Sequence, residues 1–154
     1  PPGNGAYVTR NALMGLITQI EMGHGCPTSM TSGSLMALRH QPELAEIWEP
    51  LTISRSYDQQ LKAPSAKSGV LLGMGMTEKQ GGSDVRANTS TATPVSVGGP
   101  GREYRIEGHK WFTSAPMCDA FLVLAYAPKG MSCFPVPRVL PDETRNSLRL
   151  MRLK

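Results

Sequence analysis

The residues best suited to chemistry lie in one stretch, residues 71–85 (LLGMGMTEKQGGSDV). The stretch begins as an apolar run of strand length and becomes a polar loop at Thr77. Side chains alternate between the two faces of a strand, so Gly73, Gly75 and Thr77 are expected on one face. Glycine inside a strand often marks a close approach to the backbone. The pattern therefore predicts a bare surface on which a flat group can lie.

The second half of this stretch has the composition of an anion site. Residues 81–84 (GGSD) place two glycines before the hydroxyl of Ser83. Glycines can turn successive N–H groups toward one point, and such a concavity suits a phosphate. A flat ring followed by a phosphate is the outline of a dinucleotide-like cofactor. A strand that ends in an ordinary glycine turn is the simpler alternative, because a single Gly-Gly-Ser is a weak signal.

A second stretch, residues 108–114 (GHKWFTS), offers a surface for a ring. Gly108 is expected to form a hairpin turn after the strand-like residues 103–107. In an extended chain, Trp111 and Thr113 share a face, so an indole for stacking lies beside a hydroxyl for hydrogen bonding. Together they could hold a heteroaromatic ring by its face and its edge. A core tryptophan beside an edge threonine is the alternative.

Considered together, these motifs resemble the middle β-domain of the flavin-dependent acyl-CoA dehydrogenases. The resemblance rests on residues 76–85 (MTEKQGGSDV) followed by residues 110–114 (KWFTS). The sequence is most similar to the alkylation-response branch of that family, and the resemblance extends from about residue 10 to residue 154. Further segments in the style of this branch are residues 26–31 (CPTSMT), 73–76 (GMGM), 132–134 (SCF) and 136–138 (VPR).

The resemblance implies FAD as cofactor and assigns nine residues to it. These are Met74, Met76, Thr77, Gly82, Ser83, Trp111, Phe112, Thr113 and Ser114. In this assignment Thr77 bonds the flavin ring system, Ser83 bonds the pyrophosphate, and the indole of Trp111 lies against the isoalloxazine. Many relatives have Pro-Gly-Ala-Gly-Ser where this chain has residues 79–83 (KQGGS), and this departure leaves the acyl-CoA preference open.

The resemblance also implies a reaction, the oxidation of the α,β-bond of an acyl-CoA thioester. The family's catalytic base is a glutamate on a C-terminal helical bundle, and we expect this sequence to be an internal fragment without that bundle and without turnover of its own. Glu78 belongs to the flavin loop and is not assigned as the base. Two alternatives stay open: an alkylation-response flavoprotein that binds DNA through a missing C-terminal region, and a flavin-free relative with the same fold. A complete protein of this family is expected to be a homo-oligomer.

The remaining sequence predicts an α+β fold with a boundary near residue 68. Residues 1–68 carry the helical part, with a first helix from Thr9, a second over residues 29–39 and a third from Pro42 that Pro50 closes. Residues 69–154 are expected to form an antiparallel sheet or barrel from short runs separated by glycine and proline. The six predicted strands cover residues 70–77, 89–97, 103–106, 110–113, 120–125 and 131–136.

Composition sets further bounds on location and partners. The net charge of +4 comes from residues 78–154, which hold eleven basic and seven acidic side chains. This basic half lacks the interleaved aromatic residues of a single-strand binder. Three widely spaced cysteines suggest free thiols in a reducing, cytoplasmic compartment and support neither a metal site nor a cysteine–histidine pair. No apolar run reaches the roughly 18 residues of a membrane span.

Overall fold

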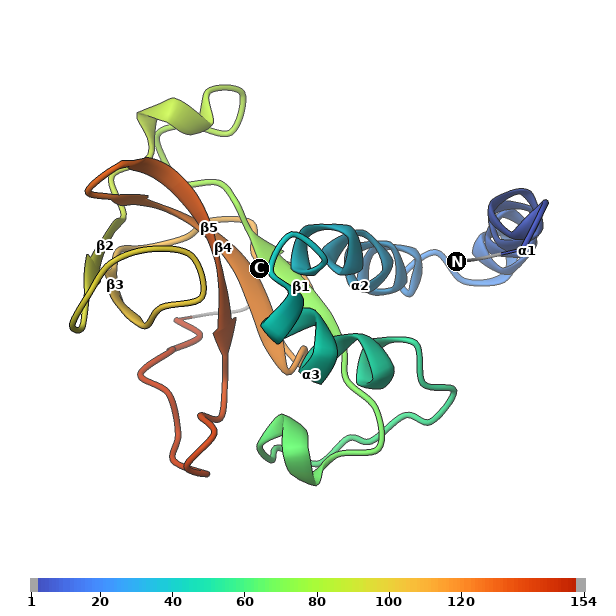
Figure 1. Ribbon diagram of the computed structural model, residues 1–154. Coiled ribbons are helices and arrows are strands. Elements are labelled where there is room, and N and C mark those ends of the chain that lie inside the picture. The colour runs from blue at the N-terminus through green and yellow to red at the C-terminus, as the bar shows by residue number, and fades with distance from the viewer. Residues whose placement is uncertain (1–2, 152–154) are drawn as a thin grey trace.

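A computed structural model describes residues 3–151 of the chain as three helices followed by one sheet (Figure 1). The predicted α+β class is confirmed. The helices are α1 (Ala6–Ile20), α2 (Gly25–Leu38) and α3 (Pro42–Thr52), with two short 3₁₀ turns, η1 (Pro64–Ala66) and η2 (Val85–Ala87). The strands are β1 (Leu72–Gly75), β2 (Thr91–Pro94), β3 (Tyr104–Glu107), β4 (Ala120–Ala127) and β5 (Gly130–Pro137).

Strand β4 is the centre of the sheet. Strand β5 pairs with it antiparallel along its whole length, from Ala120 opposite Pro137 to Ala127 opposite Gly130. The other edge of β4 is shared, because β1 pairs there in parallel over the first four residues and β2 bridges at Tyr126. Strand β3 completes the sheet by pairing antiparallel with β2. All strands that surround the predicted site therefore depend on β4 for their position.

The sheet is mixed, whereas the sequence predicted an antiparallel one. Antiparallel pairing holds for β2–β3 and β4–β5, but β1 runs parallel to β4. The parallel pair arises because the long connection between β1 and β4 returns the chain to the same end of the sheet. The predicted strand at residues 110–113 is also wrong, since only Trp111 there forms an isolated bridge.

Gly108 does not form the predicted hairpin turn. Its role is close approach, because a Cβ at this position would lie 2.0 Å from Oγ of Ser90. Only a residue without a side chain lets the chain pass Ser90 at this distance. A glycine is needed at this position, but for close packing against Ser90 and not for a turn.

The helices α2 and α3 cover one face of the sheet and form its main core. Leu38 and Trp48 pack there with Val70, Leu72 and Ala120. Trp48 is thus the packing anchor that the sequence suggested. Pro50 lies inside α3 and does not close the helix as predicted, since α3 continues to Thr52.

A threonine of α2 fixes the helix against β1. The hydroxyl of Thr31 donates to the carbonyl of Leu72 at 3.2 Å and accepts from the amide of Leu72 at 3.1 Å. Both polar backbone groups of Leu72 on this strand are satisfied in this way, so the helix covers the strand at this residue.

A second, smaller core lies around Phe121, with Cys118 and Val123 as buried neighbours. Phe121 stands opposite Gly73 in the sheet register. Next to this core, Asp119 and Lys67 form a buried ion pair at 2.5 Å, and the second carboxylate oxygen of Asp119 accepts from the amide of Leu71. The pair ties the connector after α3 to the start of β4.

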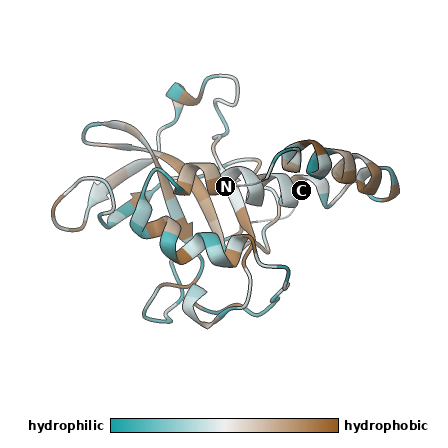
Figure 2. Ribbon diagram, turned by 45° about the vertical axis from the view of Figure 1, so that its right-hand side comes forward, coloured by the Kyte–Doolittle hydropathy of each residue, from teal (hydrophilic) through white to brown (hydrophobic). Residues whose placement is uncertain are grey.

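Helix α1 lies apart from the sheet (Figure 1) and has no buried residue. In Figure 2 much of its ribbon has the colour of hydrophobic residues, and Leu13, Leu16, Ile17 and Ile20 are all exposed. Within residues 3–151, no helix is long and apolar enough to cross a membrane.

Candidate functional site

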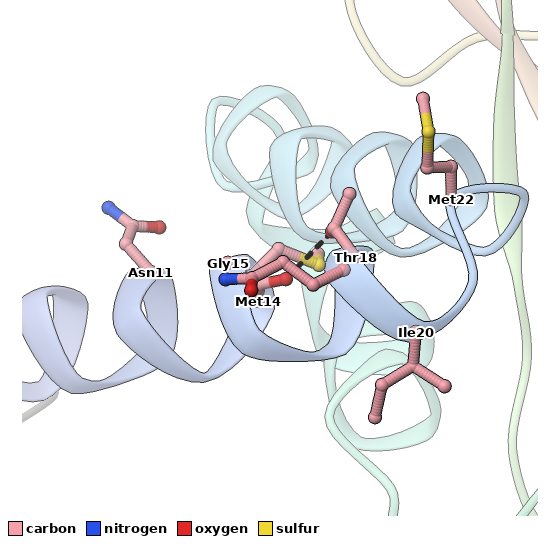
Figure 3. A pocket seen from close by; sticks show the side chains of 7 residues that line it. Asn11, Met14, Gly15, Thr18, Ile20 and Met22 are labelled. Atoms are coloured by element: carbon pink, nitrogen blue, oxygen red, sulfur yellow. Dashed lines mark hydrogen bonds between the residues drawn. The ribbon is translucent and has the colours of Figure 1, made fainter.

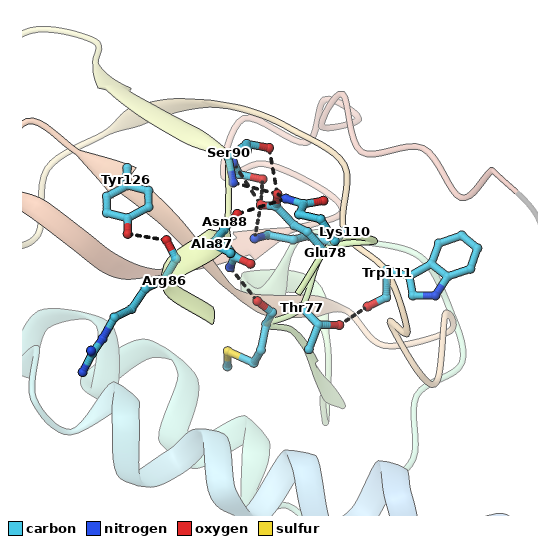
Figure 4. Close-up of polar contacts among 12 residues, drawn as sticks. Thr77, Glu78, Arg86, Ala87, Asn88, Ser90, Lys110, Trp111 and Tyr126 are labelled. Atoms are coloured by element: carbon cyan, nitrogen blue, oxygen red, sulfur yellow. Dashed lines mark hydrogen bonds and ion pairs between the residues drawn. The ribbon is translucent and has the colours of Figure 1, made fainter. Parts of the chain in front are cut away.

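The end of β1 and the segment before β4 meet at Thr77 and Trp111 (Figure 4). The hydroxyl of Thr77 donates to the carbonyl of Trp111 at 2.7 Å, and the amide of Trp111 donates to the carbonyl of Thr77 at 3.0 Å. The structure thus brings together two predicted site residues that are 34 positions apart. Because the O–H of Thr77 is used in this bridge, its oxygen is left to act toward a ligand as an acceptor.

The chain leaves the extended conformation at Phe112, immediately after this bridge. Phe112 has a φ of 54° and Ala115 a φ of 53°, both in the left-handed region that non-glycine residues seldom adopt. The expectation that Trp111 and Thr113 share one face of a strand is therefore wrong in its geometry. Backbone strain of this kind persists where the surroundings fix it, and it collects at functional sites.

The bare face predicted at Gly73 and Gly75 is covered by the protein itself. A Cβ at Gly73 would lie 2.6 Å from the ring of Phe121, so the flat group at this glycine is the chain's own phenylalanine. A Cβ at Gly75 would lie 3.4 Å from Lys110 and 3.5 Å from the hydroxyl of Thr113. These contacts correct the expectation of a ligand at the two glycines and place Thr113 beside β1.

The loop after β1 turns tightly and folds back on Thr77. Glu78 and Gly81 exchange backbone hydrogen bonds around the turn, and a Cβ at Gly82 would lie 3.7 Å from the methyl group of Thr77. Neither Gly81 nor Gly82 has a positive φ, and Gly81 is required because a Cβ would lie 2.6 Å from the carbonyl of Asp84. Among residues 3–151, no group accepts a hydrogen bond from the amides of Gly82 and Ser83. Two amides and the exposed hydroxyl of Ser83 are therefore available as hydrogen-bond donors to a ligand such as a phosphate.

The remaining predicted site residues surround this junction. Met74 is half-buried and its methyl group lies 3.5 Å from the Cβ position of Gly33 in α2. The carbonyl of Met76 accepts from the side chain of Asn88 at 2.8 Å. Phe112 and Ser114 are exposed.

The indole of Trp111 is half-buried and has several neighbours. The ring of Phe112 meets it edge-on with centroids 6.0 Å apart, and Nζ of Lys79 lies 5.9 Å from its centroid. In Figure 4 the indole points away from the polar groups around Glu78. The ring is thus held on the side of the junction where an aromatic ligand could stack.

Glu78 is the most strongly held polar group at the junction (Figure 4), with a side chain that is 2% exposed. One carboxylate oxygen accepts from Lys110 at 2.8 Å and from the amide and hydroxyl of Ser90 at 2.9 and 2.5 Å. The other accepts from the amide and hydroxyl of Thr89 at 2.7 and 2.8 Å and from Gln80 at 2.7 Å. The carboxylate is therefore saturated, with three donors on each oxygen.

These contacts decide the charge state of Glu78. Burial alone would raise the pKa of the carboxyl group, but hydrogen bonds from Lys110, Ser90 and Thr89 outweigh it and hold the pKa well below its ordinary value of 4.5. A carboxylate without a free lone pair and with a depressed pKa is unsuited to accept a substrate proton. The structure agrees with the interpretation that Glu78 is not the catalytic base.

The polar partners of Glu78 were missed by the sequence reasoning. Thr89, Ser90 and Lys110 lie 11, 12 and 32 positions from it. Residues so far apart in the sequence form no periodic pattern that would indicate their contact. The available hint was a lysine directly before an apolar Trp-Phe pair, where a charge needs a partner if it is buried.

The cysteines offer no reactive thiolate at this site. Burial raises the pKa of Cys118 to about 12. Cys26 is exposed on α2, and all three cysteines are free thiols. A thiol with a raised pKa is a poor nucleophile.

A separate groove lies along α1 (Figure 3). Its volume is about 740 Å³, and it includes Met14, Thr18 and Met22. The hydroxyl of Thr18 donates to the carbonyl of Met14 within the helix. None of the predicted cofactor residues lines this groove, so it is separate from the candidate site.

Comparison with protein families gives two matches that divide the chain. Residues 73–150 match the family described as acyl-CoA dehydrogenase, middle domain. Residues 1–59 match the family described as adaptive response protein AidB N-terminal domain.

Curated relatives match over most of this chain but are much longer. The putative acyl-CoA dehydrogenase AidB of Escherichia coli is 47% identical over 98% of this chain and 27% of its own length. Acyl-CoA dehydrogenase family member 11 of Caenorhabditis elegans is 27% identical over 84% of this chain and 21% of its own. The chain spans only about a fifth to a quarter of these relatives.

Two solved structures share the fold. The apo form of Bd2924 has a TM-score of 0.67 at 30% identity and covers 84% of this chain and 26% of its own. The Caenorhabditis elegans ACDH-11 in complex with C11-CoA has a TM-score of 0.66 at 28% identity, with 84% of this chain and 22% of its own covered.

Proposed function

The chain belongs to the acyl-CoA dehydrogenase family, and from this membership we propose that it forms part of the FAD site of an oxidoreductase. In the proposal, residues 1–68 are part of an N-terminal helical domain and residues 69–154 are the middle β-domain. The family matches at residues 1–59 and 73–150 support this division.

The observation that carries the proposal is the Thr77–Trp111 bridge next to the loop of Gly82 and Ser83. The bridge fixes an indole at one side of the junction. The loop presents two amides without an acceptor among residues 3–151, and an exposed hydroxyl. The segment that carries the indole and the loop that carries the donors both meet Thr77, which supports a site for a ring linked to a phosphate.

Within this proposal each residue has a binding role. Trp111 and Phe112 contact the ring system, Thr77 accepts a hydrogen bond from it, and Ser83 donates to the pyrophosphate. The other assigned residues, Met74, Met76, Gly82, Thr113 and Ser114, complete the contacts. FAD, when bound, supplies the hydride acceptor for the oxidation of a substrate CH–CH bond.

We propose an acyl-CoA thioester as the substrate of the complete protein. A solved relative with the same fold is described in complex with C11-CoA, which supports this substrate class. The saturated carboxylate of Glu78, with its lowered pKa, is unsuited to act as the catalytic base. The family resemblance assigns the base to a glutamate in another part of the complete protein. Purification of the complete protein, a visible absorption spectrum and an acyl-CoA oxidation assay test the proposal; a colourless protein that neither takes up FAD nor oxidises acyl-CoA would contradict it.

A DNA-associated role in the alkylation response is the second candidate. The match of residues 1–59 to an adaptive response protein domain favours it. In this alternative the FAD site is the same and DNA binds elsewhere in the complete protein. A DNA mobility shift that weakens with salt, measured beside the acyl-CoA assay, separates the two candidates.

Assembly and location are also part of the proposal. We expect the complete protein to be a homo-oligomer located in the cytoplasm. The exposed apolar side chains of α1 support further packing partners, and the free thiols support a reducing compartment. Light scattering of the complete protein tests the assembly.

A further inference from the structure

Glu78 lies between the two halves of the candidate nucleotide site. It directly follows Thr77, the bridge residue on the ring side, and it begins the turn that ends at Gly81 on the phosphate side. Its ion-pair partner Lys110 directly precedes Trp111. The buried carboxylate thus touches neither half of the proposed ligand site, yet it is bonded to the chain beside both.

The contacts of Glu78 join three separate segments. Lys110 anchors the segment that carries the indole. Gln80 anchors the turn toward the phosphate loop, and it also donates to the carbonyl of Ala87 at 3.2 Å on the far side of that loop. Ser90 and Thr89 anchor the start of β2, which is itself paired in the sheet. The carboxylate therefore holds both halves of the site in place relative to the start of β2.

We propose that Glu78, with Lys110, is a positioning residue that holds the ring half and the phosphate half of the FAD site at a fixed separation. The proposal rests on the proposed function, since it concerns the same site. A ligand with two linked parts gains affinity from the second part only when the two subsites keep the spacing that the linker can span. Loss of Glu78 is then expected to weaken the binding of FAD, whereas ligands that represent only the ring half or only the phosphate half keep their affinity.

The test compares FAD with riboflavin and ADP, which represent the two halves, by calorimetric titration of the complete apoprotein. We expect Glu78→Gln to raise the Kd of FAD at least tenfold and to leave the Kd of riboflavin and of ADP within twofold. The measurement is made well below the unfolding midpoint of the variant, so that all the protein is folded. A role limited to stability would not produce this difference between linked and separate ligands.

Two further variants keep the test decisive. Lys110→Met leaves the carboxylate with five donors. We expect it to raise the Kd of FAD about threefold to tenfold and to leave the Kd of riboflavin and of ADP unchanged. If Glu78→Gln does not fold, this variant tests the positioning role. Glu49→Gln is the matched control, because it makes the same chemical change in the ion pair between Glu49 on α3 and Arg39 at the end of α2, outside the site. All three Kd values should stay within twofold.

Two results would overturn the positioning role while leaving the FAD site in place: an unchanged Kd of FAD in both variants, or an equal loss for all three ligands. Failure of the wild-type protein to bind FAD would overturn the proposed function as well, and the wild-type titration shows this separately.

Discussion

Glu78 and Lys110 form a buried ion pair at 2.8 Å, one residue along from the bridge between Thr77 and Trp111. The segment after β1 and the segment at residues 110–111 are therefore joined twice, by an ion pair and by backbone hydrogen bonds at the adjacent residues. This arrangement fixes the part of the chain from which the proposed flavin contacts project, and it makes the consequences of several substitutions predictable.

Loss of the Glu78 charge should destabilise the protein strongly. Glu78→Gln leaves the ammonium group of Lys110 without its anion, in a side chain that is 12% exposed. Breaking a buried pair in this way costs about 3–5 kcal/mol. The free energy of unfolding from urea denaturation of the complete protein measures it. Glu49→Gln breaks a more exposed pair and should have a much smaller effect, because solvent screens an exposed ion pair; equal losses in the two variants would refute the buried character of the Glu78 contact.

The stabilisation from Glu78 should depend on pH in a defined direction. Its pKa in the folded protein is lower than the ordinary value of 4.5. The contribution is therefore fully present above pH 4.5 and is lost as the pH falls toward the folded-state pKa. The difference in unfolding free energy between wild type and Glu78→Gln should be constant from about pH 5 to pH 7 and shrink below pH 4.5. A difference that grows on acidification would contradict this prediction.

Gly108 should not tolerate a side chain. Alanine at this position brings a Cβ within 2.5 Å of the Cβ of Ser90, which also donates to Glu78. Overpacking of this kind costs about 1–3 kcal/mol, measured as a lower unfolding midpoint in urea. Gly15→Ala is the matched control, because nothing lies within 4 Å of its Cβ position inside α1; it should raise stability by about 0.5–1 kcal/mol. A neutral Gly108→Ala would show that the chain passes Ser90 less closely.

Ser83 should contribute to cofactor affinity but not to stability. Its side chain is exposed, and a hydrogen bond to a charged phosphate is worth about 1.5–3 kcal/mol. Ser83→Ala should therefore raise the Kd of FAD about tenfold to a hundredfold without a change in the unfolding midpoint, as titration and thermal melting of the complete protein can measure. Ser96→Ala, in an exposed turn after β2, should change neither quantity. An unchanged Kd in Ser83→Ala would remove Ser83 from the pyrophosphate contact.

Local patterns in the sequence predicted the elements better than their arrangement. Apolar spacing indicated the three helices and five of the strands, and Trp48 was correctly expected in the core. The parallel pairing of β1 with β4 depends on a contact between residues about 48 positions apart, for which no local signal exists. Gly108 shows the same difficulty, because close approach to Ser90 and a tight turn both select glycine.

The candidate site was predictable where residue types carry their own chemistry. Composition and spacing singled out the loop at Gly82 and Ser83 and the ring at Trp111, and the structure places Gly82 and the backbone of Trp111 beside Thr77. Their roles in binding a cofactor stay predictions. The left-handed backbone at Phe112 could not be foreseen, since phenylalanine usually avoids it. The network around Glu78 was missed because hydrogen bonds among residues 78, 89, 90 and 110 depend on the folded sheet.

The most direct test of the FAD site is a titration of the complete apoprotein with FAD, followed by tryptophan emission. The chain contains two tryptophans, of which Trp48 is buried in the core between the helices and the sheet. We predict that equimolar FAD quenches the emission and that Trp111→Phe removes the share of the quenching that comes from Trp111, whereas Trp48→Phe leaves the quenching as in the wild type. Emission that stays unchanged in the wild-type protein, together with no flavin bound after dialysis, would contradict the assignment of this β-domain as a flavin site.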